Sequence, residues 1–121
     1  MVMFDTNMIL RYLLDDNKEM AEKAEQYLNT RNVSVTPEII AEVVYVLKGV
    51  YSLKRSMVTD TIKKFMELVN CQEHDIVILA LETFSNKNLD FVDCVLYAYH
   101  KLQNIEIATF DKKLKKLIFD D

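Results

Sequence analysis

Four acidic residues, each at or near the start of an expected helix or inside an apolar one, stand out as candidates for chemistry: Asp5, Glu42, Asp93 and Asp111. Asp5 and Asp111 each follow a short apolar run typical of a strand. Ligands of open parallel sheets bind at the carboxyl ends of the strands, so we expect these acids to face one crevice. Gathered carboxylates raise one another's pKa values unless cations balance them, and Mg²⁺ or Mn²⁺ is the best-suited cation. The pattern indicates phosphodiester hydrolysis by water bound to one or two metal ions.

Other nucleophiles and metals find no support in the sequence. No motif positions a serine, cysteine or histidine for attack on a substrate. Cys71 and Cys94 show no CxxC spacing, and His74 and His100 share no ligand motif. The sequence therefore supports neither a zinc site nor a disulfide framework, and we expect both thiols to be reduced and structural.

Three of the acids, and a neighbour, also have a simpler interpretation as helix caps. Asp5 and Asp111 can each accept hydrogen bonds from the first free amides of the helix that follows. Asp90 and Asp93 resemble a capping pair, and both favour the positive end of a helix dipole. One cap suffices for a helix, however, so a second acid one turn in is free to point into the crevice.

Glu42 has two interpretations that the residues alone leave open. It lies within residues 39–47, which are apolar on nearly every side of the expected helix. A buried carboxylate is costly unless it is paired or coordinates a metal. Alternatively, Glu42 lies on one wet stripe of the helix together with Glu38, Tyr45 and Gly49.

Length and composition predict one globular domain over residues 1–121. Half of the residues are hydrophobic and 28% are charged, which is an ordinary balance for a folded protein. A single Gly and a single Pro leave little material for tight hairpins, which disfavours an all-β fold. With no signal-like or membrane-spanning stretch, we expect a cytoplasmic protein without a membrane partner.

The charge of the chain does not by itself indicate a nucleic-acid-binding protein. Formal net charge is −4 and the pI is about 5.2. Lysines and arginines gather at residues 54–55, 63–64 and 112–116. Each of these runs is expected to be a solvated helix face.

The expected elements alternate between strands and helices along the chain. Strands are expected at the opening apolar run and over residues 33–35 and 105–109, and helices over 6–14, 18–28, 37–50, 54–68, 75–84, 90–100 and 112–117. The apolar run 76–79 also fits a strand, but the spacing of Ile76, Leu79, Ala80 and Phe84 favours a helix. This order predicts an α/β fold, a three-layer α/β/α sandwich with a short central parallel sheet.

Four segments together resemble one known family, the PIN-domain ribonucleases, and in particular the VapC-type toxins of toxin–antitoxin pairs. The segments are residues 5–13 (DTNMILRYL), 41–47 (AEVVYVL), 90–98 (DFVDCVLYA) and 109–112 (TFDK). Each is short and weak alone, but the four in the family's order within one domain are specific in combination. The resemblance spans the whole chain.

The resemblance implies roles for these residues. Asp5, Glu42, Asp93 and Asp111 would form the acidic Mg²⁺ or Mn²⁺ site, with Thr6, Asn7 and Thr109 as polar supports and Asp90, ranked below Asp93, as a cap or accessory acid. It further implies an RNA substrate, a homodimer, and a VapB-like antitoxin whose tail enters the active-site groove, often with an Arg against the acids.

Basic residues near the acids suggest how such a substrate is held. Lys112 and Lys113 follow Asp111, and Arg11 lies near Asp5. We hypothesise that they contact flanking phosphates of the RNA. Unchanged RNA affinity and unchanged salt dependence after their replacement by Ala would contradict this hypothesis.

Two alternatives belong to other classes of protein. A receiver-like or phosphatase-like domain also gathers acids around Mg²⁺ and uses an Asp as phosphoryl acceptor. Here Asp5 has no second acid two residues on, and Glu42 has no role in that scheme. A catalytically inert PIN-like module that binds RNA or protein is the other alternative, and the presence of all four acids argues against it.

Overall fold

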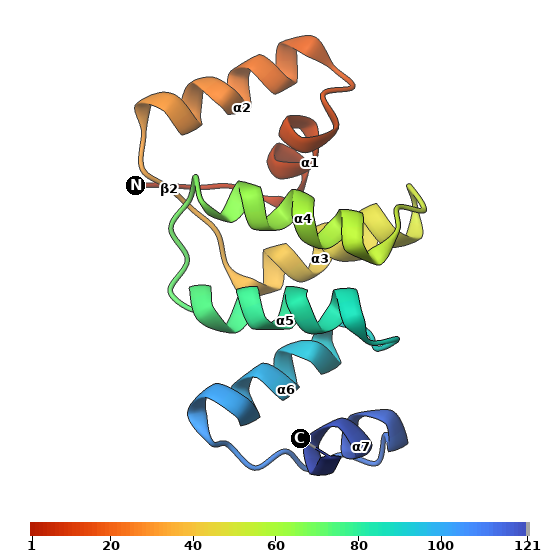
Figure 1. The fold of residues 1–121 in the computed structure, drawn as a ribbon. Helices are drawn as coiled ribbons and strands as arrows, with labels where there is room; N and C mark the ends of the chain where they lie inside the picture. The colour runs from red at the N-terminus through yellow and green to blue at the C-terminus, as the bar shows by residue number, and fades with distance from the viewer. Residues whose placement is uncertain (121) are drawn as a thin grey trace.

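The chain folds into seven helices and two short strands within residues 1–120, the part that this computed structural model describes (Figure 1). In chain order the elements are β1 (Val2–Met3), α1 (Thr6–Leu14), α2 (Lys18–Thr30), β2 (Val33–Ser34), α3 (Pro37–Gly49), α4 (Arg55–Met66), α5 (His74–Asn86), α6 (Phe91–Gln103) and α7 (Lys112–Asp120). In Figure 1, α1 and α2 lie at one end, α6 and α7 at the other, and α3, α4 and α5 between them.

The sheet is short and parallel, as predicted. Val2 is paired with Val33 and Met3 with Ser34. The pairing extends by one parallel bridge from Ser34 to Asn70, where the amide of Val35 donates to the Asn70 carbonyl at 2.9 Å. The structure confirms the α/β class and the parallel sheet, whereas the three-layer sandwich stays a prediction.

The strand predicted over residues 105–109 is wrong. These residues pair with no strand among those described, and the side chain of Ile105 is 43% exposed. The reason lies at the end of α6, where Asn104 adopts the left-handed conformation and His100 Nδ1 lies 2.9 Å from the carbonyl oxygen of Ile105. This turn sends the chain back along α6 to α7, whose Leu114 is fully buried, and not to the free edge of β1.

The helix predictions are confirmed, with differences at their ends. Helix α1 has the expected bounds, and α3 begins at Pro37 as expected, with Thr36 as its N-cap. The ambiguous run 76–79 lies in α5, as its helical spacing favoured. That helix starts at His74, one residue before the expected range, and its N-cap is Glu73.

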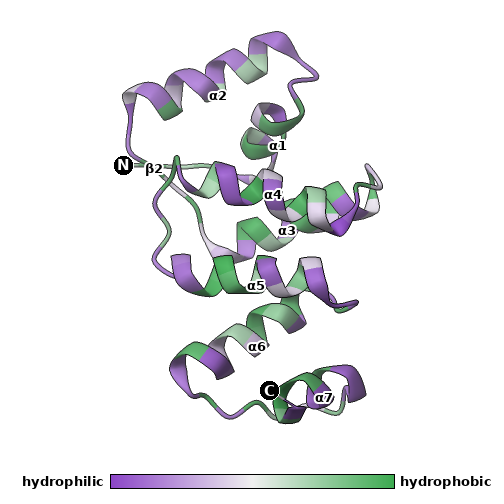
Figure 2. Ribbon diagram, viewed as in Figure 1, coloured by the Kyte–Doolittle hydropathy of each residue, from purple (hydrophilic) through white to green (hydrophobic). Residues whose placement is uncertain are grey.

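One hydrophobic core joins the two ends of the molecule. Its largest fully buried side chains come from separate elements, among them Phe4, Ile9, Ile40, Phe65 and Leu81. Figure 2 shows α2 as largely hydrophilic and α3 as largely hydrophobic. This contrast follows from their positions, because α2 packs chiefly on α1 whereas α3 contacts α1, α4 and α6.

Both cysteines are free thiols. Cys94 is fully buried, and burial raises the pKa of its thiol to about 12. Burial also raises the pKa of Cys71. Thiols that resist ionisation are poor nucleophiles, which agrees with a structural role. Separately, no helix in residues 1–120 has the length and apolar character needed to cross a bilayer.

Candidate active site

Asp5 lies between β1 and α1 and caps the helix. Its backbone is extended, and its Oδ1 accepts a hydrogen bond from the Met8 amide at 2.9 Å. The capping interpretation is therefore confirmed. It does not exclude a second role, because a carboxylate has two oxygens and the side chain is exposed.

Thr6 connects the first acidic motif to the second. Its hydroxyl donates a hydrogen bond of 2.7 Å to Oε2 of Glu42, across 36 residues of sequence. Glu42 is exposed, so the interpretation as a buried carboxylate is wrong and the wet stripe with Glu38 and Tyr45 is what α3 presents. α3 is buried on the opposite side, where Val43 and Leu47 are in the core.

Asp93 lies one turn into α6 and has acidic neighbours. Its pKa is raised above the ordinary value of 3.8 by partial burial, then by the negative charge of Asp111 and that of Asp90. The structure thus brings the third and fourth motifs within electrostatic range of each other. Asp90 occupies the N-cap position of α6, but its side chain makes no capping hydrogen bond, contrary to the capping-pair interpretation.

Asp111 caps α7, as the sequence allowed. Its Oδ1 accepts from the Leu114 amide at 2.8 Å, and its own amide donates to Thr109 Oγ1 at 3.0 Å. Thr109 therefore supports the backbone of Asp111. Asn7, the other proposed support, is exposed in the first turn of α1 and lines a surface hollow together with Arg11.

Arg55 is a residue that the sequence analysis missed. Its Nη1 donates to the carbonyl oxygens of Phe84, Lys87 and Leu89 at 3.1, 2.9 and 2.8 Å. Its Nη2 donates to Asn88 Oδ1 at 3.3 Å, and the guanidinium lies 4.1 Å from the centre of the Phe84 ring.

This network fixes residues 87–89, the loop that leads directly to Asp90 and Asp93. Arg55 is thus no part of a solvated basic run. One signal was present in the sequence: a cation in the first turn of a helix opposes the helix dipole, so an Arg at that place needs a compensating partner. The partners themselves are 29 to 34 residues away, beyond any local pattern.

The three basic residues proposed for phosphate contact differ in their availability. Arg11 Nη1 is 3.0 Å from Asp16 Oδ2, so its charge is already paired. Lys113 Nζ lies 3.5 Å from the carbonyl oxygen of Asn88, which brings α7 to the loop that precedes Asp90. Lys112 is exposed next to Asp111.

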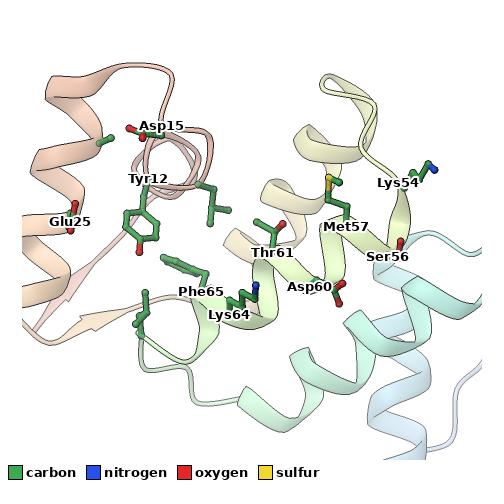
Figure 3. Close-up of a pocket in the computed structure, with 13 residues that line it drawn as sticks. Tyr12, Asp15, Glu25, Lys54, Ser56, Met57, Asp60, Thr61, Lys64 and Phe65 are labelled. Carbon is green, nitrogen blue, oxygen red and sulfur yellow. The ribbon is translucent and has the colours of Figure 1, made fainter.

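Two cavities of about 600 Å³ differ in their relation to the acids. The one in Figure 3 lies between α1, α2 and α4, where Tyr12 and Phe65 are in ring contact, and includes none of the four candidate acids. The other lies beside α6 and is lined by Asp90 and Asp93 together with residues of α3. The second cavity is the one next to the candidate chemistry.

The acids are linked in two groups, the Asp5 motif with Glu42 through Thr6, and Asp93 with Asp111 and Asp90 through their charges. Among residues 1–120, no three His, Cys, Asp or Glu side chains lie close enough together to hold a metal ion. The donor chemistry nevertheless fits Mg²⁺ or Mn²⁺, since Mg²⁺ is commonly held by one or two carboxylates, water and substrate phosphate. The pKa of Asp93 is raised by partial burial and then by the charges of Asp111 and Asp90, and a cation bound there would offset these charges.

The chain belongs to the PIN domain family, whose model matches residues 2–119. Searches of curated proteins and of solved structures found no match. The family supports a nuclease-like fold and, at a coarse level, a hydrolase, and PIN domains typically use divalent metal ions. The family resemblance seen in the four sequence segments is thereby confirmed at the level of the PIN domain.

Proposed function

We propose that the chain is a metal-dependent endoribonuclease that hydrolyses RNA phosphodiester bonds, and that it is the cytoplasmic toxin of a VapBC-type pair. The observation that supports this most is the pairing of acids from distant motifs. Thr6 holds Glu42 beside the Asp5 motif, and Asp111 is near enough to raise the pKa of Asp93. Such an arrangement suits chemistry on a phosphodiester, because its charges favour a hard cation.

Each acid has a role in this proposal. Asp5, Glu42, Asp93 and Asp111 would hold Mg²⁺ or Mn²⁺, and the chemistry supplied by such an ion is polarisation of a phosphoryl oxygen and activation of water. The hydroxyl of Thr6 fixes the orientation of the Glu42 carboxylate. The caps made by Asp5 and Asp111 fix the positions of those two side chains.

The proposal includes partners. RNA is the substrate, and Lys112 and Lys113 contact phosphates beside Asp111. Arg11 contributes less than the sequence suggested, because Asp16 neutralises it. The functional unit is a homodimer, and a VapB-like antitoxin blocks the groove by placing an Arg against the acids.

A second candidate is an inert PIN-like binding module. The observation that favours it is that no three His, Cys, Asp or Glu side chains within residues 1–120 are placed to hold a metal ion together. The two candidates differ in one measurable property, which is metal-dependent cleavage.

The test is incubation of purified protein with a mixed structured RNA in Mn²⁺, Mg²⁺ or EDTA, beside the variant Asp93→Asn. Asn has nearly the same shape as Asp but lacks the charge, so the variant should fold. We expect cutting that requires metal and is lost in the variant. Absence of cutting by both proteins with either metal would favour the binding module.

A further inference from the structure

The cavity beside α6 is more than a space around the acids. It is lined on one side by Asp90, Val92 and Asp93 of the α6 start, and on the other by Tyr45 and Lys48 of α3. We call it the α3–α6 groove. Its volume of about 600 Å³ is room for a ligand larger than a metal ion.

Tyr45 is the most unusual lining residue. It is 75% exposed, although an aromatic ring on a helix normally packs into a core. It follows Glu42 by three residues, so both side chains lie on the same face of α3. Exposed aromatic rings are the side chains on which unpaired nucleobases stack in proteins that bind single-stranded RNA.

Lys48 supplies the free positive charge of the groove. It is exposed one turn beyond Tyr45, and no ion pair within residues 1–120 involves it. Arg55 also lines the groove, but its guanidinium is committed to carbonyl oxygens of the 84–89 segment. Lys48 is therefore the cation that remains for a phosphate.

We propose that the α3–α6 groove binds a nucleotide of single-stranded RNA next to the phosphodiester that is cleaved. The base stacks on Tyr45, the exposed Val92 contacts the base or the ribose, and Lys48 binds the flanking phosphate. Duplex RNA is excluded from this mode because its bases are stacked on one another. The inference rests on the proposed function, since it takes RNA to be the substrate of the same site.

The test is the affinity of fluorescein-labelled RNA hexamers, oligo(A) and oligo(U), measured by fluorescence anisotropy in EDTA. No cleavage occurs without metal, so binding is measured separately from catalysis. Tyr45→Ala should weaken binding by about fivefold or more, the usual effect of removing one stacking ring. Tyr45→Phe should bind like the original protein, because it keeps the ring. Lys48→Met should lower the slope of log affinity against log salt by about 0.7.

Matched controls separate the groove from general surface effects. Tyr51→Ala removes another exposed ring, and Lys18→Met another exposed lysine, neither of which lines the groove. Both should leave affinity unchanged, and a hairpin duplex should bind worse than the hexamers.

Two outcomes would overturn the inference: equal affinity of Tyr45→Ala and Tyr51→Ala, or no hexamer binding by any protein. These outcomes are distinct from failure of the proposed function, which is absence of metal-dependent cutting. Cutting that persists unaltered in Tyr45→Ala, with unaltered affinity, would leave the nuclease standing without this groove.

Discussion

The two groups of acids are held together in different ways. In the N-terminal group, a hydrogen bond of 2.7 Å from Thr6 joins the Asp5 motif to Glu42. In the C-terminal group, the pKa of Asp93 is raised first by partial burial and then by the negative charges of Asp111 and Asp90. The first group is ordered by its own contacts, whereas the second has to be held in place by other parts of the protein.

The surrounding elements explain the difference. α1 and α3 contact each other and both pack into the core. The hydrogen bond from Thr6 to Glu42 between them therefore costs little conformational entropy. Asp111 instead follows residues 104–110, which lie in no helix or strand, and Asp93 follows the loop that Arg55 fixes. The comparison suggests that the N-terminal group is preorganised and that a cation would stabilise the C-terminal group more.

The largest expected loss of activity comes from removing the charge of Asp5 while its helix cap is kept. Asn caps helices as well as Asp does, so Asp5→Asn should keep the melting temperature within error. RNA cleavage should fall by about 100-fold, a typical effect of losing one preorganised electrostatic group. Steady-state cleavage in Mn²⁺ and thermal denaturation measure the two quantities.

The companion variant Asp5→Ala separates the two roles of this residue. It loses both cap and charge, so it should be as inactive as Asp5→Asn and also less stable by about 1 kcal/mol. Full activity of Asp5→Asn would show that Asp5 acts only as a cap.

Thr6→Val tests the bridge within the N-terminal group. Val keeps the shape of Thr but removes the hydroxyl, so the Glu42 carboxylate loses the hydrogen bond that orients it. Loss of such a supporting contact at a metal site typically costs at least tenfold, and we expect cleavage to fall by about tenfold. Thr6→Ser keeps the hydroxyl and should restore most of the activity. Equal rates for the two variants would contradict an orienting role.

Arg55→Lys tests the support of the C-terminal group. Lys keeps the charge but not the planar fork, so most of the hydrogen bonds to residues 84–89 should be lost. We expect about 2 kcal/mol less stability, severalfold slower cleavage and faster hydrogen exchange at the amides of residues 87–93. Lys63→Met is the matched control because it breaks only the exposed pair with Glu82, also between α4 and α5. Similar exchange in both variants would refute a specific effect of Arg55 on residues 87–93.

Much of this arrangement could be predicted from local sequence. The caps at Asp5 and Thr36 and the spacing of apolar residues place α1 and α3, because these signals act within one or two turns. The apolar pattern at residues 105–109 led to a wrong strand prediction. A strand forms only where it pairs with the edge of a sheet, and that pairing depends on residues far away in the sequence. The exposure of Glu42 and the partners of Arg55 likewise depend on helix packing, which no short window of sequence contains.

The smallest expected effect concerns the charge of Asp93 itself. Its pKa in the folded state is raised above 3.8, so folding favours the protonated form. The stability contributed by that form is fully present below pH 3.8 and is lost as the pH rises through the folded pKa. In EDTA at pH 7, Asp93→Asn should therefore melt at a slightly higher temperature than the original protein. The advantage should vanish as the pH falls below 3.8.

The same variant then distinguishes the two groups of acids. Divalent cations bound near Asp93 offset the repulsion from Asp111 and Asp90, so Mg²⁺ should raise the melting temperature of the original protein and reverse the order of the two proteins at pH 7. Asp111→Asn is the control. It removes the neighbouring charge with the larger effect on the pKa of Asp93, so the melting-temperature difference should depend less on pH. A difference between Asp93→Asn and the original protein that is constant with pH would show that the pKa of Asp93 is not raised, by burial or by its acidic neighbours. The two groups would then differ only in their hydrogen bonds, and not in the electrostatics of their carboxylates.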